Sequence, residues 1–321
     1  MLQNTARLVD LAPEVVSFRD AVLYGLARTP KSIPPMYFYD AKGSALFEAI
    51  CELPEYYPTR AETQILRSHA AEIAARIGPA AHLIEYGSGA TQKVRPLLDA
   101  LEAPVAYTPV DISGEHLDAA AQRLATAYPD IEVTAIVADY SRPFSVPTPQ
   151  RPAMTRAALF LGSTIGNFAP DEALSFLRQA ARRLSGGGCL LLGADLRKDP
   201  KRLHAAYNDA AGVTAQFNLN LLTRINRELG GNFEPDSFAH YAFYNPLPGR
   251  IEMHLVSRRT QRVSVSGRSF GFGEGESVHT ENSYKFTVDG LQDIARRAGF
   301  EPDDVWLDDE ELFSLHLLRA P

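Results

Sequence analysis

Short apolar runs alternate with helical patterns through the middle of the chain. Between the runs, apolar residues recur every three or four positions, as they do along the buried face of a helix. Strands covered on both faces read as continuous apolar runs, so this alternation predicts a parallel sheet with helices on both sides. The runs are residues 81–85, 105–110, 131–137, 157–161 and 189–195.

The two ends of the chain add further elements to this pattern. Residues up to about Thr29 have the spacing of a helix, and residues 62–77 predict another. After a helix over residues 291–299, residues 305–307 and 312–318 predict two final strands, the last of them antiparallel. We therefore expect an α/β fold with a Rossmann-like, seven-stranded sheet.

Two segments interrupt the strand–helix rhythm. After a helix that begins at Asp199-Pro200, residues 233–276 alternate like strands, which predicts an inserted α+β subdomain. Residues 36–57 are rich in Tyr and Phe and are bracketed by prolines, so they form either a helical cap or a lid lined with phenols. We expect residues 61–197 and 286–321 to form a cofactor-binding domain, and residues 1–60 and 198–285 a substrate-binding domain.

The turn after the first run carries Gly87-Ser88-Gly89, with Lys93 close behind. A strand, a glycine turn and a helix hold nucleotide-like ligands in α/β sheets, although a plain strand-to-helix turn looks the same. The third glycine of the dinucleotide pattern is replaced by Gln92. This favours a ligand without a pyrophosphate, such as the adenosyl part of S-adenosylmethionine (SAM).

Polar residues follow the next three runs at the same edge of the predicted sheet. Asp111 ends the second run, 24 positions after Gly87, and is placed either to bind ribose hydroxyls or to cap a helix. Asp139-Tyr140 follows the third run and either borders an adenine or opens a loop. Asn167, beyond Gly162, either binds a substrate or closes a turn.

Two further groups belong to the predicted insertion. Tyr207 and Thr214 are seven positions apart and share a face of a helix. Glu281 and Ser283 point the same way from an extended strand, either into a site or as a charged strand face in water.

Composition narrows the class of protein. The 321 residues carry a net charge of −7, which argues against a general nucleic-acid binder. Cys51 and Cys189 are too few and too far apart for a disulfide framework, and the histidines show no metal-ligand spacing, so we expect no metal. Without a signal peptide or an apolar run long enough to cross a membrane, we expect a cytoplasmic protein with no membrane partner. We also expect a monomer.

The motif string resembles the ergothioneine-pathway histidine Nα-methyltransferases, from about Pro30 to the C-terminus. The residues that carry this resemblance are Phe38-Tyr39-Asp40 with Gly43-Ser44, Leu53 to Arg60, Gly87-Ser88-Gly89 with Lys93, Leu161 to Asn167, Tyr207 to Thr214, Ile251-Glu252-Met253, and Glu281 with Ser283. The resemblance implies the class I methyltransferase fold, SAM as cofactor and L-histidine as the small-molecule substrate. Tyr86 and Tyr140 depart from the residues usual at their positions.

The resemblance also implies residue roles. Asn167 and Tyr207 would hold the substrate carboxylate, Tyr56, Glu281 and Ser283 would surround the imidazole, and Thr214 and Met253 would complete the pocket. Tyr39, Tyr56 and Asn167 are the expected catalytic residues. The expected cofactor contacts are Gly87, Ser88, Gly89, Lys93, Asp111, Asp139, Tyr140 and Gly162.

The expected reaction is trimethylation of the α-amine of histidine to hercynine, the first step of ergothioneine biosynthesis. One alternative is a SAM-dependent N-methyltransferase of another aromatic amino acid or amine, such as tryptophan. Two others are a NAD-dependent oxidoreductase on the same sheet and a catalytically idle SAM-binding module.

Overall fold

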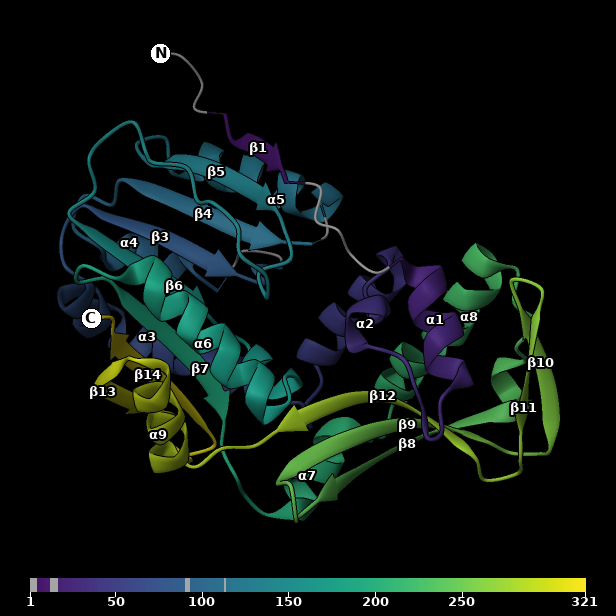
Figure 1. Cartoon of the computed structure of the whole chain (residues 1–321). Coiled ribbons are helices and arrows are strands. Elements are labelled where there is room, and N and C mark those ends of the chain that lie inside the picture. The colour runs from purple at the N-terminus through teal and green to yellow at the C-terminus, as the bar shows by residue number, and fades with distance from the viewer. Residues whose placement is uncertain (1–4, 12–16, 90–92, 113) are drawn as a thin grey trace. The chain divides into compact units, whose positions relative to one another are not determined.

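A mostly parallel sheet forms the centre of the first of two units in the computed structural model, which describes residues 5–11, 17–89, 93–112 and 114–321 (Figure 1). Its strand order is β1-β5-β4-β3-β6-β7-β14-β13. Only β14 runs antiparallel to its neighbours. The strands are β1 (Arg7–Asp10), β3 (Ala81–Tyr86), β4 (Ala106–Asp111), β5 (Glu132–Val137), β6 (Thr155–Phe160), β7 (Cys189–Asp195), β13 (Glu301–Leu307) and β14 (Phe313–Arg319). Without β1, this is the predicted seven-stranded sheet with its antiparallel last strand.

The N-terminal prediction was wrong. Arg7–Asp10 pair in parallel with residues 134–137 of β5, so the described part of the sheet has eight strands and not seven. Among the described residues, the helix expected up to Thr29 corresponds to α1 (Phe18–Ala27), which belongs to the second unit. A run as short as Leu8-Val9 satisfies a helical pattern as easily as an edge strand, and pairing with β5 decides between them.

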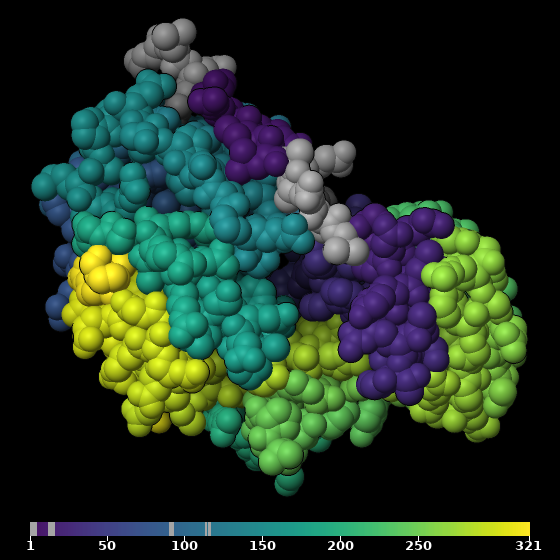
Figure 2. Space-filling view, viewed as in Figure 1, coloured from purple at the N-terminus to yellow at the C-terminus, as the bar shows by residue number. Residues whose placement is uncertain are grey.

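Helices cover both faces of this sheet. On one face lie α3 (Pro58–Ile77), α4 (Arg95–Ala100) and α5 (Gly114–Ala127), packed on Leu83 and its neighbours. On the other lie α6 (Pro170–Leu184) and α9 (Val288–Ala298), packed on Ile84 and its neighbours. Consecutive residues of β3 therefore serve two separate cores, as expected of a strand buried on both faces. The C-terminal part of the chain, in yellow, forms one continuous stretch of the surface in Figure 2.

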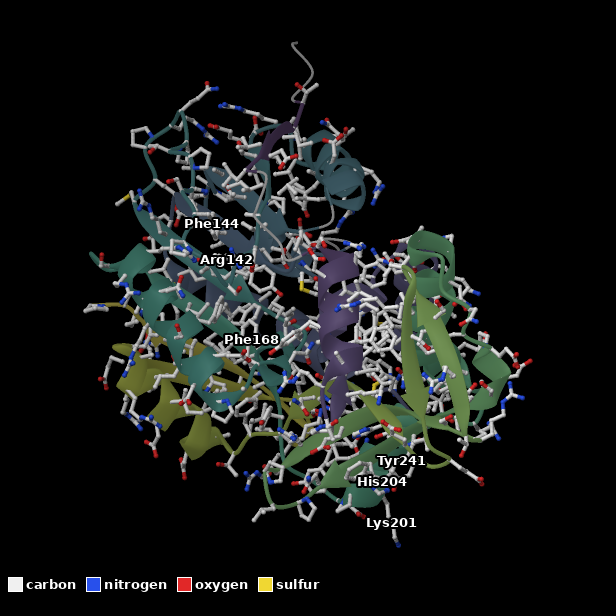
Figure 3. All side chains as sticks on the ribbon, turned by 45° about the vertical axis from the view of Figure 1, so that its right-hand side comes forward. Arg142, Phe144, Phe168, Lys201, His204 and Tyr241 are labelled. Atoms are coloured by element: carbon white, nitrogen blue, oxygen red, sulfur yellow. The ribbon has the colours of Figure 1, made fainter. Side chains whose placement is uncertain are left out.

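The second unit comprises residues 17–60 and Arg197–Lys285 among those described. Its sheet has the order β2-β12-β9-β8, and β10 and β11 form a separate hairpin. Its elements are α1, β2 (Lys31–Ser32), η1 (Pro35–Phe38), α2 (Ala41–Cys51), α7 (Pro200–Tyr207), α8 (Val213–Leu229), η3 (Pro235–Ser237), β8 (Phe238–Asn245), β9 (Arg250–Ser257), β10 (Gln261–Val265), β11 (Arg268–Phe272) and β12 (Ser277–Tyr284). His204 on α7 and Tyr241 on β8 mark two packed elements of this unit in Figure 3.

A β-bulge in β12 gives its sheet two different faces. His279 pairs with His254 of β9, but the next pair is Glu281 with Met253, so Thr280 is the extra residue. Without the bulge, residues 279, 281 and 283 would share a face, because side chains alternate along a strand. With it, Glu281 and Ser283 face the same side as Met253, while His279 and Asn282 face the other.

The inserted segment leaves and re-enters the first unit at one point. The Phe286 N–H donates to the carbonyl of Asp195 at 3.0 Å, and Leu196 and Phe286 form a parallel bridge. Within the part of the chain that the structure describes, no helix has both the length and the apolar character required to cross a membrane.

Candidate active site

The turn after β3 brings backbone close to an aromatic ring. Gly87 has φ +67°, a conformation that side chains with a Cβ rarely adopt. Its N–H donates to the Val110 carbonyl at 2.8 Å, and a Cβ at Gly87 would lie 3.6 Å from the Tyr140 ring. The predicted strand, turn and aromatic residue therefore meet at the carboxyl edge of the sheet.

The same turn offers polar groups to a ligand. Ser88 is buried, and its hydroxyl has no hydrogen-bond partner among the residues described. The Gly89 N–H lies 3.4 Å from Asp111 Oδ2, at the end of β4. A buried hydroxyl without a partner costs free energy unless a ligand completes it, so these groups fit the polar parts of SAM. Gln92, at the third glycine position, lies outside the described residues.

Asp139 forms a turn at the end of β5. Its Oδ1 accepts hydrogen bonds from the Ser141 N–H at 3.0 Å and the Ser141 hydroxyl at 2.5 Å, and Arg142 Nε lies 3.4 Å from Oδ2 (Figure 3). These contacts match the loop-opening alternative, and a role beside adenine stays a proposal. Burial, with the charges of Asp111 and Asp139, raises the pKa of Tyr140, so its phenol is neutral at ordinary pH.

Glu62 of α3 joins Lys93, which follows the predicted glycine turn at residues 87–89, to a second glycine turn at Gly162, and was missed in the sequence. Its side chain is fully buried; Oε2 accepts from Lys93 Nζ at 2.7 Å and Oε1 from the Gly162 N–H at 2.6 Å. Gly193 on β7 provides the space, since a Cβ there would lie 2.4 Å from Oε1. The sequence pattern that could have predicted its burial is the position of an acid on the same apolar helix face as Ile65, Leu66 and Ile73.

Asn167 ends η2 (Thr164–Asn167), beyond the carboxyl end of β6. It is half-buried, and the next residue, Phe168, stacks on Phe160 with 6.1 Å between ring centroids (Figure 3). Asn167 therefore belongs to the first unit, at the edge that carries the glycine turns. Its expected contact with substrate stays a proposal.

Five of the predicted substrate residues line one pocket, formed entirely within the second unit. Among the described residues that line it, Glu281 is the only acid, and the rest are mainly aromatic or aliphatic. The lining residues are Phe47, Ile50, Tyr56, Ala206, Tyr207, Thr214, Phe217, Met253 and Glu281. Tyr39 is 37% exposed, and its ring packs against Phe47 and Phe217 at centroid distances of 5.6 and 5.7 Å.

A polar network continues from this pocket along β12. The Tyr207 hydroxyl donates to Ser283 Oγ at 2.9 Å, and Lys285 Nζ lies 2.8 Å from the same oxygen and 3.2 Å from Tyr207 Oη. Lys285 is 2% exposed and was missed in the sequence. The sequence pattern that could have predicted Lys285 is the alternation of Glu281, Ser283 and Lys285, which places three polar side chains on one strand face.

The low polarity of the pocket shifts the pKa values of its titratable groups. Burial raises the pKa of Glu281 to about 7, and the positive charge of Lys285 opposes part of this rise. Burial, followed by the effect of Tyr207, raises the pKa of Tyr56 well above its usual value. At neutral pH the pocket therefore holds a neutral phenol and a carboxyl group near its titration midpoint.

The remaining residues of the motif string hold this unit together. Asp40 accepts from the Gly43 N–H at 2.7 Å and caps α2. Asp209 accepts from the first two N–H groups of α8, those of Val213 and Thr214, at 2.8 Å. Arg60 donates to the carbonyls of Leu53, Pro54 and Tyr56, which fixes the turn before α3. These motif residues therefore have structural roles that position the pocket lining.

Comparison with known proteins identifies relatives over most of the chain. The chain is 43% identical over 307 residues to the histidine N-alpha-methyltransferase of Mycolicibacterium smegmatis, covering 94% of each chain. It is 42% identical to the histidine N-alpha-methyltransferase of Mycobacterium tuberculosis, again over 94% of each chain. It is 30% identical to ergothioneine biosynthesis protein 1 of Neurospora crassa, covering 90% of this chain and 33% of that protein.

A family model described as "histidine-specific methyltransferase, SAM-dependent" matches residues 18–320. This range includes every described strand of the central sheet except β1, the glycine turns, and the pocket that contains Glu281. The chain therefore belongs to the family of histidine-specific, SAM-dependent methyltransferases.

Proposed function

We propose that this protein transfers three methyl groups from SAM to the α-amine of L-histidine and forms hercynine, the first step of ergothioneine biosynthesis. The family and the two relatives named for histidine methylation support the reaction class. The position of Glu281 supports the choice of substrate, and it is the observation that carries the proposal.

A buried carboxyl group in an otherwise mostly apolar pocket suits an imidazole. A neutral imidazole offers one N–H donor and one nitrogen acceptor, so it can pair with the Glu281 carboxyl group in either protonation state. With its pKa near 7, Glu281 populates both states at neutral pH. An apolar substrate ring would leave this group buried without a partner, which costs several kcal/mol. The pocket therefore favours histidine over substrates with an apolar ring.

We propose the remaining expected contacts as the residues that hold SAM and the substrate. Gly87, Ser88, Gly89, Lys93, Asp111, Asp139, Tyr140 and Gly162 would hold SAM, and Asn167 and Tyr207 the substrate carboxylate. The neighbouring Ser283, Thr214 and Met253 would complete the pocket around the ring and the amine. When bound, SAM supplies an electrophilic methyl group to the neutral amine.

The chain must remove a proton from the substrate ammonium at each methyl transfer that begins from a charged amine. Because the pKa of Tyr56 is raised, its phenol stays protonated and would pass a proton on only while accepting another. We propose this relay role for Tyr56, and for the more exposed Tyr39. If Tyr39→Phe and Tyr56→Phe both keep full kcat from pH 6 to 9, the relay is wrong.

Mass spectrometry of a reaction with SAM and a mixture of amino acids tests the proposed function. We expect histidine alone to gain mass in three methyl steps, with one S-adenosylhomocysteine formed per step. Methylation of tryptophan or another aromatic amine in preference to histidine would overturn the substrate assignment. Absence of any methylated product would overturn the proposed reaction.

We further propose that the protein acts as a monomer in the cytoplasm, without nucleic-acid or membrane partners and without a metal in its reaction. Light scattering during size-exclusion chromatography tests the first point, with 35.2 kDa as the expected mass. Full activity after treatment with a chelator tests the last point.

A further inference from the structure

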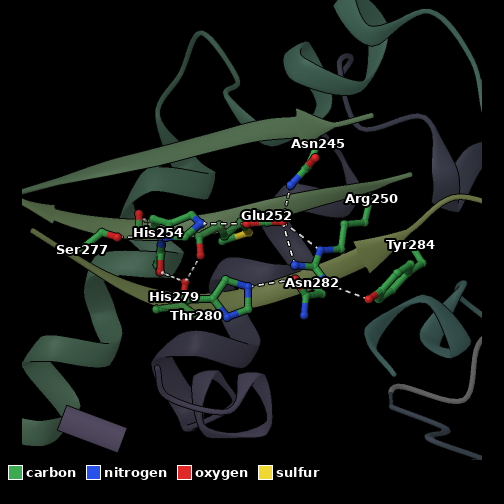
Figure 4. A network of polar contacts seen from close by, with 11 residues as sticks. Asn245, Arg250, Glu252, His254, Ser277, His279, Thr280, Asn282 and Tyr284 are labelled. Carbon is green, nitrogen blue, oxygen red and sulfur yellow. Dashed lines mark hydrogen bonds and ion pairs between the residues drawn. The ribbon is translucent and has the colours of Figure 1, made fainter. Parts of the chain in front are cut away.

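Three metal-ligand side chains meet on the face of the β2-β12-β9-β8 sheet opposite Met253 and Glu281 (Figure 4). Glu252 and His254 come from β9 and His279 from β12. One ligand atom from each residue lies within 4.8 Å of the others. The group takes no part in the pocket, whose lining comes from the other face of the same strands.

Strand geometry explains why these residues meet. Glu252 and His254 are two positions apart and so share a face of β9, and His279 is the direct cross-strand partner of His254. The two histidines are 25 positions apart in the sequence, so spacing along the chain gave no metal signal.

Neighbouring residues fix the orientation of both imidazole rings. His254 Nδ1 lies 3.2 Å from Ser277 Oγ, while its Nε2 points to Glu252 Oε2 at 3.3 Å. His279 Nε2 lies 2.9 Å from Asn282 Oδ1. Hydrogen bonds from the second ring nitrogen orient histidines in metal sites in the same way.

Hydrogen bonds to one oxygen of Glu252 leave its other oxygen directed at the histidines. Arg250 and Asn245 donate to Glu252 Oε1, at 2.8–2.9 Å, so Oε2 is the oxygen directed at His254. The Arg250 charge opposes a nearby cation and limits the affinity of the site.

We propose that Glu252, His254 and His279 bind one divalent transition-metal ion of the zinc class. Two imidazole nitrogens and one carboxylate oxygen are ligands that Zn²⁺ and its neighbours accept, with water completing the coordination. The ion would join β9 to β12 on the face away from the pocket. Its role is structural and separate from the proposed methyl transfer.

Titration of the tag-free, full-length protein with ZnCl₂ and with CoCl₂ tests this site after chelator dialysis. We expect one ion per chain by calorimetry, and a visible Co²⁺ absorption band. His254→Gln and His279→Gln should each weaken binding at least about tenfold, because each removes a ligand. His69→Gln is the matched control, since His69 is an exposed histidine whose Nδ1 lies 3.2 Å from a carboxylate oxygen of Glu72.

Equal binding by the wild type and the His254→Gln and His279→Gln variants would overturn the proposal, as would no binding by the wild type. X-ray absorption of the Zn²⁺-loaded wild type covers the case in which a variant fails to fold. Scattering from two imidazoles supports the site, and a spectrum without imidazole scattering overturns it.

Discussion

Glu281 is the residue on which substrate choice depends. It is 9% exposed, and this burial raises its pKa to about 7 because the surrounding residues do not replace the water that normally solvates a carboxylate. A hydrogen-bond donor on the substrate would stabilise this poorly solvated carboxylate. Binding would therefore recover the free energy that burial of Glu281 costs in the free protein.

Glu281→Ala should lower kcat/KM for histidine by about 10- to 100-fold, because a buried hydrogen bond to a charged or polar partner is lost. The dissociation constant for SAM should change less than about twofold. Steady-state kinetics and calorimetry measure the two effects. Glu274→Ala, at an exposed acid in the same unit, is the control. If Glu281→Ala weakens SAM binding by the same factor as it lowers kcat/KM for histidine, Glu281 does not select the substrate.

The pH dependence of stability should report the same carboxyl group without any substrate. An acid with a raised native pKa binds more protons in the native state than in the unfolded state, so its contribution to stability falls as pH rises from about 4.5 to about 7. Glu281→Gln removes this slope. Between pH 5 and 8, the variant should gain up to about 3 kcal/mol relative to the wild type. Urea denaturation at both pH values measures this, and parallel curves for the two proteins would refute it.

At the residue scale, sequence reasoning identified side chains near a turn or on an alternating strand, such as Ser88 and Glu281. It missed Glu62 and Lys285. A buried acid on a helix looks like a surface residue until its partners are known, and those of Glu62 lie 31 and 100 positions away. Spacing along the chain contains no information about such pairs.

Among the elements, α3 and β7 form the contact that holds the glycine turns. Gly193→Ala should place a Cβ against Glu62 and displace it from Lys93 and Gly162. We expect a loss of about 1–3 kcal/mol, since overpacking and a weakened buried ion pair both contribute.

Gly271→Ala on β11 is the matched control, because a Cβ there meets no atom within 4 Å. Thermal or urea unfolding measures both variants. If Gly193→Ala is no less stable than Gly271→Ala, the packing of Glu62 against β7 does not hold the turns in place.

The strands of the central sheet were predicted well because each is buried on both faces, which leaves an apolar run in the sequence. The runs at residues 81–85 and 189–195 match β3 and β7 to within one residue. β1 was missed because a short edge strand has one open side, and the bulge at Thr280 because it depends on the pairing of β12 with β9.

At the scale of the whole molecule, each unit is assembled from separate parts of the chain. Asp195 and Phe286 are hydrogen-bonded neighbours, so a short Gly-Ser linker can replace the 89 residues Arg197–Lys285. A protein of residues 58–196 joined in this way to residues 286–321 should fold and bind SAM, but should not bind histidine.

Circular dichroism and calorimetry test this shortened protein against the full chain. Cooperative unfolding with SAM binding is the expected result. A chain that does not unfold cooperatively would show that the sheet unit is not autonomous, and histidine binding would contradict the assignment of its pocket to the second unit.

The bulge in β12 also places the two proposed ligands on opposite faces of one pair of strands. Since Thr280 turns Glu281 towards one side and His279 towards the other, a metal ion and an amino acid would each load opposite surfaces of the same two-stranded ribbon. Thermodynamic linkage requires that any factor by which zinc alters the affinity for histidine equals the factor by which histidine alters the affinity for zinc. Any such effect would change the affinity for histidine and leave the methyl transfer itself without a metal.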